Sequence, residues 1–343
     1  VLNEDGISGY ITSNKLMTIK AGVSVRNYML QNYNIHHISD LGDTKLFTAS
    51  VLPCIMIFSK GITTEADKVE FTSVYEEKSD IQDVVEIKNI FEAIYESGTY
   101  RIPDGRCYTF QQGSLKSTSL DELWTIASAE NEKWLKCVEM NTWMIFADIG
   151  KIRVGIKTTA DNVFIGDDWE GEKADLELLK PLITHRNAGQ IVANTANQWK
   201  VLYTHTVVDG KKVAYNIDEY PKSKKYLLQF YNQLSGRGYL EKAHRNWYEI
   251  WVPQNPASWK HKKIVFRDIS EEPQFWLDET GAVVNGDCYW IDINDDVLED
   301  VIYLALAIAN SKFIERFYDV KFNTKLYSGK RRYMTQYVEQ FPI

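Results

Sequence analysis

The most restrictive feature of the chain is a nearly continuous apolar run between Ser50 and Ser59, which reads Val-Leu-Pro-Cys-Ile-Met-Ile-Phe and is bounded by Gly61. A strand in which polar and apolar residues do not alternate has to be covered on both faces. Such strands are typical of α/β sheets that carry helices on each side. We therefore expect this run to form a buried strand of a layered α/β sheet.

The residues before this run alternate between strand-like and helix-like patterns. A short strand at Tyr10–Thr12 is followed by a helix over Val25–Tyr33 and a second strand over Ile35–Leu41. Residues 1–65 are thus predicted to be the last strands of a doubly wound sheet, without its beginning. Because the chain opens with Val1 rather than Met, in the approach to a strand, we interpret it as part of a longer polypeptide.

The rest of the chain divides into a connector and a loop-rich domain. Residues 66–144 are polar and poorly periodic, with a strand near Tyr108 and a helix that runs from a capping box at Ser119 and Glu122 to about Met140. From residue 145, short strand-like runs alternate with turn signals, and a helix from Asp300 to about Tyr318 closes the chain. The expected strands are Ile152–Gly155, Val163–Ile165, Lys200–Tyr203, Val213–Ile217, Tyr248–Val252, Lys263–Asp268 and Cys288–Ile293.

The charge of the chain is unevenly distributed. The net charge is −8, yet residues 180–268 hold 15 Lys and Arg against 6 Asp and Glu, and residues 312–332 hold 7 against 2. An acidic body with two basic segments is what a local phosphate-contacting face would produce. Cations scattered over a solvated surface would give the same sequence, so charge alone leaves both alternatives open.

Composition excludes several other classes. The chain is 44% hydrophobic and 25% charged, as in ordinary soluble domains. It has no apolar run of roughly 18 residues and no basic-then-apolar leader. None of its four cysteines forms a CxxC pair, and His36 and His37 would face opposite sides of a strand. We therefore expect no membrane span and no metal site, and a reducing cytoplasm as the setting.

Six islands of sequence carry a family resemblance. They are Gly9–Met17 (Gly-Tyr-Ile-Thr-Ser-Asn-Lys-Leu-Met), Ile38–Phe47, Gly155–Phe164, Leu178–Ile183 followed by Arg186 and Asn187, Lys263–Ile269, and Tyr303–Lys312 with the closing Gln340–Ile343. In their order and spacing these islands resemble the gamma-class N6-adenine DNA methyltransferases of restriction-modification systems, with a Taq-type target-recognition domain.

The resemblance implies a fold and a function. Residues 1–65 would be the end of a Rossmann-like methyltransferase sheet, residues 66–144 a connector with a helix, and residues 145–343 a mixed α+β, mostly β target-recognition domain. The chain would recognise double-stranded DNA for an adenine-N6 methyltransferase whose methyl donor is S-adenosylmethionine. The resemblance does not extend to the family's Asn-Pro-Pro-Tyr segment or its glycine-rich cofactor loop, which this sequence lacks. The resemblance therefore assigns no catalytic residue to this chain, and the fragment alone is expected to be inactive.

The resemblance also assigns a target-base pocket. Phe47 would be the aromatic side chain that packs against the adenine after it swings out of the duplex, since an exocyclic amine inside a paired stack is unreachable. The alternative for Phe47 is a place in the core. Ser13, Asn14 and Lys15 end a strand at the carboxyl edge of the sheet, where ligands of α/β folds bind, although a helix cap is equally compatible with them.

The DNA-contacting residues are expected in the basic and polar loops of the second half. A polar loop supplies short donors, and it includes Thr159 where the family usually has glycine. A second group interleaves cations with aromatic residues, and Gly236 and Gly238 flank an arginine that could approach a base closely. The alternative for the polar loop is an ordinary hairpin turn, and the alternative for the other residues is a solvated surface. The residues are Lys157, Thr158, Thr159, Asn162, Arg186, Arg237, Tyr239, Arg245, Tyr248 and Arg267, with Lys330, Arg331 and Arg332 as the phosphate-contacting cluster.

Two other functions compete with this interpretation. A non-enzymatic DNA specificity subunit that positions a separate methyltransferase or nuclease would carry a second recognition half and a long helical spacer, and neither is evident. A carbohydrate-binding β domain would suit ten Trp and twenty Tyr, but no secretion signal supports it.

Overall fold

The structure of the chain is a computed structural model, which describes residues 2–4, 6–48, 51–77, 82–116, 119–127, 129–173, 175–194, 199–322, 326 and 330–343. The chain divides into two compact units. Unit 1 comprises Val1–Asn141 and Glu315–Arg332, and unit 2 comprises Thr142–Ile314 and Tyr333–Ile343.

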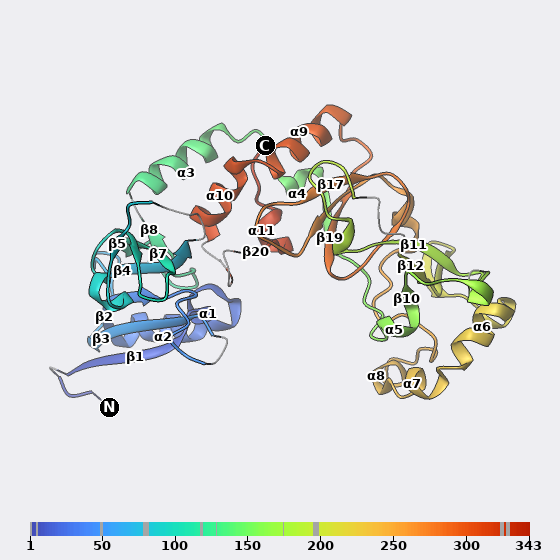
Figure 1. Cartoon of the computed structure of the whole chain (residues 1–343), viewed down its shortest axis with the longest axis horizontal. Coiled ribbons are helices and arrows are strands. Elements are labelled where there is room, and N and C mark those ends of the chain that lie inside the picture. The colour runs from blue at the N-terminus through green and yellow to red at the C-terminus, as the bar shows by residue number, and fades with distance from the viewer. Residues whose placement is uncertain are drawn as a thin grey trace. The chain divides into compact units, whose positions relative to one another are not determined.

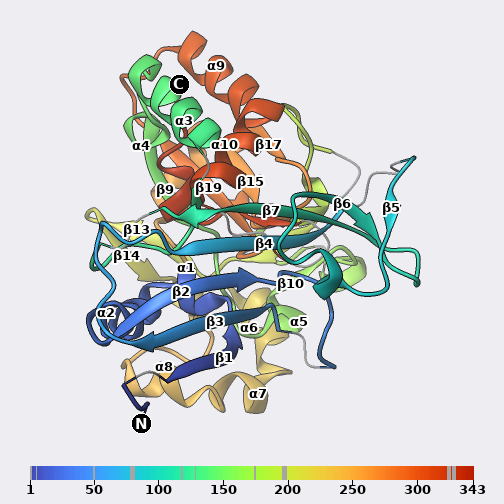
Figure 2. The same cartoon turned by 90° about the vertical axis from the view of Figure 1, so that its left-hand side faces the viewer.

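Unit 1 is built on one mixed sheet with the strand order β1-β3-β2-β4-β7-β6-β5, to which β8 is added beside β7. Figure 2 shows β7, β4, β2, β3 and β1 lying side by side. β3 is antiparallel to both of its neighbours, whereas β2 and β4 are parallel. The strands are β1 (Ile7–Ser13), β2 (Tyr33–Asp40), β3 (Pro53–Lys60), β4 (Glu70–Glu77), β5 (Val85–Glu86), β6 (Gly98–Arg101), β7 (Cys107–Leu115) and β8 (Ile126–Ala127), and β20 (Arg331–Arg332) also lies in this unit.

The apolar run forms β3 and is covered on both faces, as its pattern predicts. Cys54 and Met56 are buried in one core together with Met17 and Leu30. Ile55, on the opposite face, packs against a second core. The helices α1 (Lys15–Thr18) and α2 (Val23–Asn32) supply residues of the first core and lie beside the blue strands in Figure 1.

The expected connector is part of the same sheet. Strands β4 to β8 all fall within residues 66–144, and β4 pairs with β7 over its whole length. The sequence hides this because buried polar side chains interrupt the apolar pattern: the Thr72 hydroxyl donates to Gln112 Oε1 at 2.7 Å. Hydrogen bonds of this kind offset the cost of burying polar groups. The observed sheet is mixed and has more strands than the predicted Rossmann-like remnant. It therefore does not confirm that remnant, which stays a prediction.

The helix predicted to begin at Ser119 begins ten residues later, as α3 (Ala129–Asn141). Asp121 has a left-handed backbone (φ +68°), which a helix does not tolerate. Trp124 is buried and its backbone N–H donates to Met17 O at 3.0 Å, so the chain is held against the core until β8. The C-terminal part of unit 1 packs on α3, where the Arg316 guanidinium lies 4.6 Å from the centroid of the Trp134 ring.

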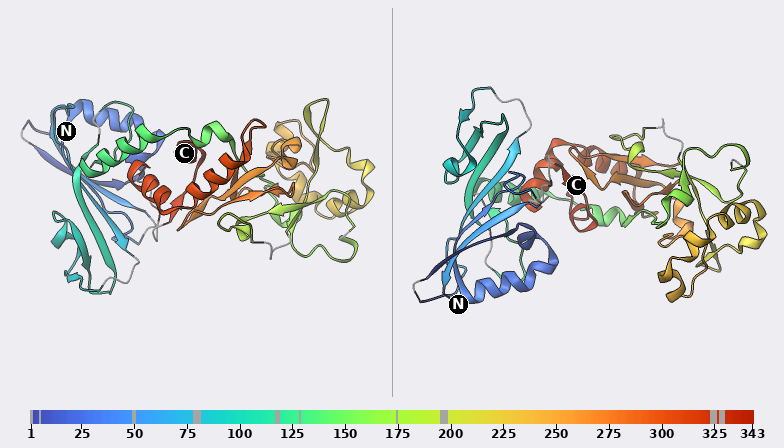
Figure 3. Two further views of the ribbon diagram at one scale, coloured as in Figure 1. Left: turned by 90° about the horizontal axis from the view of Figure 1, so that it is seen from above. Right: turned by 60° about the horizontal axis from the view of Figure 1, so that its bottom comes forward.

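Unit 2 contains two four-stranded sheets and a hairpin. The first sheet has the order β17-β15-β19-β9, and Figure 3 shows α9 running beside its orange strands. The second has the order β10-β12-β11-β18, and β13 pairs with β14. The strands are β9 (Gly150–Val154), β10 (Ile165–Gly166), β11 (Leu179–Ile183), β12 (Lys200–Leu202), β13 (His205–Val208), β14 (Lys211–Ala214), β15 (Lys263–Arg267), β16 (Ile269–Ser270), β17 (Phe275–Asp278), β18 (Val283–Val284) and β19 (Cys288–Ile293).

Unit 2 is more helical than predicted. Of residues 163–165, expected as a strand, Val163 and Phe164 end a short helix and Ile165 begins β10. Residues 248–252 form no strand, and Tyr248 and Ile250 are buried in the core from a loop. The predicted closing helix is two helices: the Asn310 amide donates to Phe275 O (2.8 Å) and Leu306 O (2.9 Å), which ends the first of them. The helices of unit 2 are α4 (Phe146–Ile149), α5 (Asp161–Phe164), α6 (Pro221–Leu228), α7 (Tyr231–Ser235), α8 (Gly238–Lys242), α9 (Glu299–Ala309) and α11 (Thr335–Val338). The second closing helix, α10 (Lys312–Phe322), belongs to unit 1 from Glu315 onward.

Candidate nucleic-acid interface

Two adjoining hollows of unit 2 bring several predicted residues together. Their volumes are about 320 and 650 Å³, and both are lined by Asp161, Asn162, Asn285 and Asp287. We call the two together the recognition hollow. The smaller hollow is also lined by Ile165, Thr184, His185, Arg186 and Trp199, and the larger by Ile156, Lys157, Thr158, Thr159, Ala160, Gln233 and Gly286.

The loop that precedes α5 forms one wall of the recognition hollow. Lys157 and Thr159 are exposed, whereas Thr158 is buried and its hydroxyl donates to Asp161 Oδ1 and accepts from Ala160 N at 3.1 Å. Thr159 has a φ of +61°, the left-handed region that favours glycine. The position at which the family usually has glycine therefore keeps a glycine-like backbone. The Thr159 hydroxyl accepts a hydrogen bond from the Tyr239 hydroxyl, and contacts of this kind hold the turn.

Arg237, which was predicted to contact a base, instead stabilises this loop through hydrogen bonds to backbone carbonyl groups. Its side chain is 7% exposed, and burial lowers the pKa of its guanidinium. The guanidinium donates to Thr158 O (3.0 Å), Leu234 O (3.1 Å) and Trp247 O (2.6 Å). Its donors are thus directed at the protein's own backbone, and the expected base contact finds no support in this geometry.

Arg245, which is half-buried, and Tyr248, which is buried, also direct their donors at the protein itself. Arg245 donates to Glu249 Oε2 (2.7 Å) and to the carbonyl groups of Ile250 (2.6 Å) and Trp251 (2.7 Å). Tyr248 is buried and its hydroxyl donates to Tyr215 O at 2.9 Å. The interleaved cations and aromatic residues that suggested a DNA-binding face are therefore mainly internal hydrogen-bond donors. Arg267 is half-buried at the end of β15 and lines neither part of the recognition hollow.

The buried His205–Glu249 pair predicts a loss of stability in acid. Burial lowers the pKa of His205, whereas hydrogen bonds from His205, the Asn246 N–H and Arg245 outweigh burial and lower the pKa of Glu249 to about 2. Below about pH 6.5 the unfolded chain binds a proton at His205, and below about pH 4.5 at Glu249, more readily than the folded chain does. We expect Tm to fall progressively below about pH 6.5.

The matched variant is His205→Gln, which keeps a hydrogen-bonding side chain at this site but does not titrate. Its Tm should fall less between about pH 7 and pH 5 than that of the unaltered chain, because one of the two linked protons is missing. Equal slopes for the two proteins over this pH interval would show that His205 does not contribute to the acid sensitivity.

Arg186 lies on the other wall of the recognition hollow, in the short 3-10 helix His185–Asn187. It is exposed, and its guanidinium lies 4.8 Å from the centroid of the Trp199 ring. Asn162 and Gln233 form an exposed amide pair, in which Gln233 Nε2 donates to Asn162 Oδ1 at 3.0 Å. Sequence patterns missed Trp199, Gln233 and Asn285, because isolated residues of these types carry no spacing signal.

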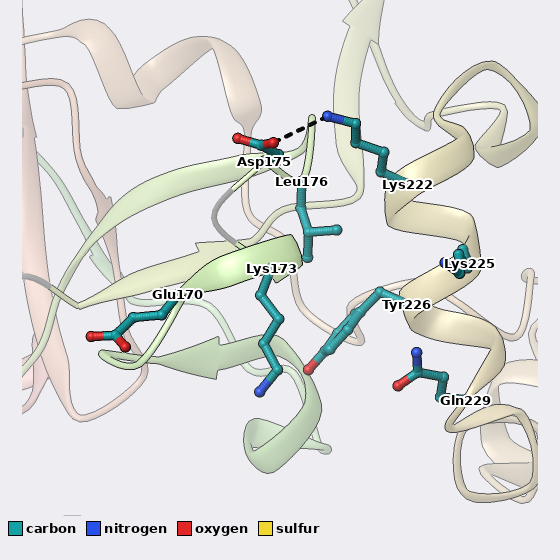
Figure 4. A pocket seen from close by; sticks show the side chains of 8 residues that line it. All are labelled: Glu170, Lys173, Asp175, Leu176, Lys222, Lys225, Tyr226 and Gln229. Atoms are coloured by element: carbon teal, nitrogen blue, oxygen red, sulfur yellow. Dashed lines mark hydrogen bonds and ion pairs between the residues drawn. The ribbon is translucent and has the colours of Figure 1, made fainter.

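A third hollow of unit 2, of about 530 Å³, is lined in part by lysines of the basic stretch 180–268 (Figure 4). Lys222 on α6 is directed at Asp175, with Nζ and Oδ2 3.4 Å apart. Lys263, elsewhere in the same basic stretch, is fully buried and forms an ion pair with Asp278 at 2.8 Å. Part of the positive charge of residues 180–268 is therefore neutralised within the protein.

In unit 1, Phe47 is 46% exposed on the loop that follows β2. The alternative that places Phe47 in a core is therefore excluded. Because β3 is antiparallel to both β1 and β2, the ends of β1 and β2 meet at one edge of the sheet. The loop that carries Phe47 begins at this edge, close in the chain to Asp40.

The same edge holds the polar residues that end β1. Asn14 is buried and donates to Asp40 Oδ1 at 3.0 Å, and its side chain does not cap α1. The Tyr75 hydroxyl donates to Asp40 Oδ2 at 2.8 Å, and burial raises the pKa of Asp40. Ser13 is half-buried and Lys15 is exposed. Asn14 is thus part of a fixed network beneath the edge, and Lys15 is presented to solvent.

The cluster predicted to contact phosphate does not act as one surface. Arg331 is buried, and it forms two 2.8 Å contacts with the Asp319 carboxylate and one of 3.5 Å with Glu315. Lys330 and Arg332 are exposed. Arg331 is therefore an internal ion-pair partner, and only its two neighbours stay candidates for phosphate contact.

Metal binding would need a group of ligand side chains, and membrane insertion would need a long apolar helix. Among the residues that the structure describes, no three His, Cys, Asp or Glu side chains are grouped so that they could hold a metal ion. Within the same residues, no helix has the length and apolar character needed to cross a membrane.

Comparisons with known proteins place the chain in a family context. Residues 205–343 match the TaqI-like C-terminal specificity domain, and residues 1–47 match the Eco57I restriction-modification methylase. The whole chain aligns with the Type II methyltransferase M.BanIII of Aneurinibacillus aneurinilyticus at 39% identity and with the Type II methyltransferase M.BstVI of Geobacillus stearothermophilus at 23%. It covers 61% and 59% of these relatives, so the chain spans about three fifths of their length.

The fold has a counterpart among solved structures. The Type IIL restriction-modification enzyme MmeI, determined in complex with DNA, matches 98% of this chain with 39% of its own, at a TM-score of 0.53 and 12% identity. This likeness concerns the fold alone. The family matches and the alignments, rather than this likeness, confirm the resemblance predicted from the sequence: the chain is similar to Type II methyltransferases, and its residues 205–343 match the TaqI-like C-terminal specificity domain.

Proposed function

We propose that this chain provides sequence-specific recognition of double-stranded DNA for an adenine-N6 methyltransferase of a restriction-modification system. The observation that supports this most directly is the recognition hollow, which presents Lys157, Arg186 and the Asn162–Gln233 amide pair on one surface of unit 2. Cations contact phosphates, and amide groups match the donor and acceptor pattern of base edges. Part of this hollow lies within the segment that matches the specificity domain.

Unit 1 would carry the aromatic residue that contacts the target base. Phe47 is exposed on a loop at the sheet edge where ligands of α/β folds bind, and it ends the segment that matches a methylase. An exposed aromatic face can replace stacking that a flipped adenine loses. S-adenosylmethionine would supply the methyl group to the complete enzyme. Asn-Pro-Pro-Tyr and a glycine-rich loop do not occur in this sequence, and the role proposed for this chain in the complete enzyme is recognition.

Salt dependence tests the proposed DNA binding. The affinity of the full chain for a fluorescent duplex with randomised sequence should fall on the order of a thousandfold between about 50 and 200 mM salt if roughly six phosphates are contacted, because bound counterions are released. Fluorescence anisotropy would measure this change. A neutral oligosaccharide series provides the comparison, and saccharide binding that is insensitive to salt, without DNA binding, would contradict the proposal.

A further inference from the structure

One arginine of the recognition hollow, Arg186, is held by contacts with neighbouring residues. The guanidinium of Arg186 lies over the Trp199 ring, with 4.8 Å between its central carbon and the ring centroid. Stacking uses the face of a guanidinium, whereas its hydrogen bonds are donated in its plane, so the two interactions compete little. An arginine held in this way keeps its fork of donors in one orientation.

The backbone beneath Arg186 is also held firmly. The Thr184 hydroxyl accepts from Arg186 N at 3.2 Å, and Asn187 Oδ1 accepts from Thr184 N at 3.0 Å. His185 Nδ1 lies 2.5 Å from Asp287 Oδ2, which ties this turn to the loop that precedes β19. Because the position is fixed before any ligand arrives, less conformational entropy is lost on binding.

The surroundings favour a base over a phosphate. The smaller part of the recognition hollow, which Arg186 lines, is also lined by the amides Asn162 and Asn285, whereas Gln233 and Lys157 line its larger part. The 530 Å³ hollow, in contrast, is lined by Lys173, Lys222 and Lys225. Amides and a planar guanidinium match the in-plane pattern of base edges, whereas lysines act as point charges on phosphate.

We propose that Arg186, held over the Trp199 ring, is a specificity-determining residue that recognises a guanine through its O6 and N7 atoms in the major groove. This inference rests on the proposed function and deepens it, because it assigns one base of the recognition sequence to one side chain. Trp199 is a positioning residue in this arrangement. It would act on sequence preference only through the guanidinium that it orients.

The experiment is selection of bound duplexes from a random-sequence library by the full chain, followed by sequencing. The unaltered chain should enrich a motif that contains guanine at a defined position. Arg186→Ala should lose preference at that position by about 5- to 150-fold and keep the other positions, since one bidentate contact carries this discrimination. Trp199→Ala should relax the same position, and Trp199→Phe, which retains an aromatic face, should relax it less.

Two further variants keep the test decisive. Arg186→Lys retains the charge without the planar fork, so it should also lose the guanine preference, and it carries the test if Arg186→Ala does not fold. Lys157→Ala in the same hollow should weaken binding to all sequences about equally. If Arg186→Ala or Arg186→Lys selects the unaltered motif, the residue contacts only phosphate and the inference is wrong. If the unaltered chain enriches no motif at all, the proposed function itself fails.

Discussion

Replacing Arg331 with alanine is expected to destabilise unit 1 by about 3–5 kcal/mol, because the substitution leaves largely buried carboxylates without their cation. Arg331 makes a two-point contact with Asp319, at 2.8 Å for each nitrogen–oxygen pair, and reaches Glu315 at 3.5 Å. Glu315 and Asp319 are four residues apart on α10, so without Arg331 they repel each other across one helical turn. Hydrogen exchange of the α10 amides and thermal unfolding would measure the loss.

The matched control is the double substitution Lys330→Ala and Arg332→Ala. Both side chains are exposed, so their removal should change stability by no more than about 0.5 kcal/mol. It should instead weaken DNA binding on all sequences and lower the salt dependence by about one phosphate for each cation removed. An Arg331→Ala variant that unfolds at the same temperature as the unaltered chain would mean that the ion pair with Asp319 contributes nothing measurable.

This pair of variants illustrates what a sequence can and cannot reveal. The basic run of residues 330–332 is visible in the sequence, but a strand or loop directs neighbouring side chains to opposite sides, so its middle member faces inward. Glu315 and Asp319, which pair with it, are indistinguishable by spacing from solvated helix residues. Charge counts predict how many cations a segment holds, whereas their partners depend on contacts between distant parts of the chain.

The fold shows the same division. The apolar run at Ser50–Ser59 and the strand Cys288–Ile293 were predictable because their patterns are strong and their sides are well covered. The strand predicted near Tyr108 is β7, whereas β4 was not predicted, since Thr72 donates to Gln112 inside the sheet and so resembles a surface residue. The prediction that a helix begins at the capping box of Ser119 was wrong, because burial of Trp124 outweighs a local helix signal. Local signals therefore fail where a long-range contact stabilises the competing conformation.

Replacing Arg237 with alanine is the second large effect that we expect. Three carbonyl groups, those of Thr158, Leu234 and Trp247, would each lose a charged donor inside the protein. A hydrogen bond from a charged group contributes about 1.5–3 kcal/mol, and an unsatisfied buried acceptor costs a similar amount, so a loss of at least about 3 kcal/mol in the free energy of unfolding is expected. Thermal or urea unfolding would measure it.

The consequence for DNA binding separates this role from direct base contact. Flanking glycines suggested that Arg237 reads a base, in which case its loss would relax one position of the recognition sequence. In the structure Arg237 instead supports the backbone of the loop that carries Lys157 and Thr159, so its loss should release that loop and weaken binding to every sequence. Tyr239→Phe, which removes only the hydroxyl that donates to Thr159, should cost no more than about 1.5 kcal/mol. Library selection by a folded Arg237→Lys variant decides between the two roles. A preference relaxed at a single base position would show that Arg237 contacts a base directly, and it would refute the role of supporting the loop.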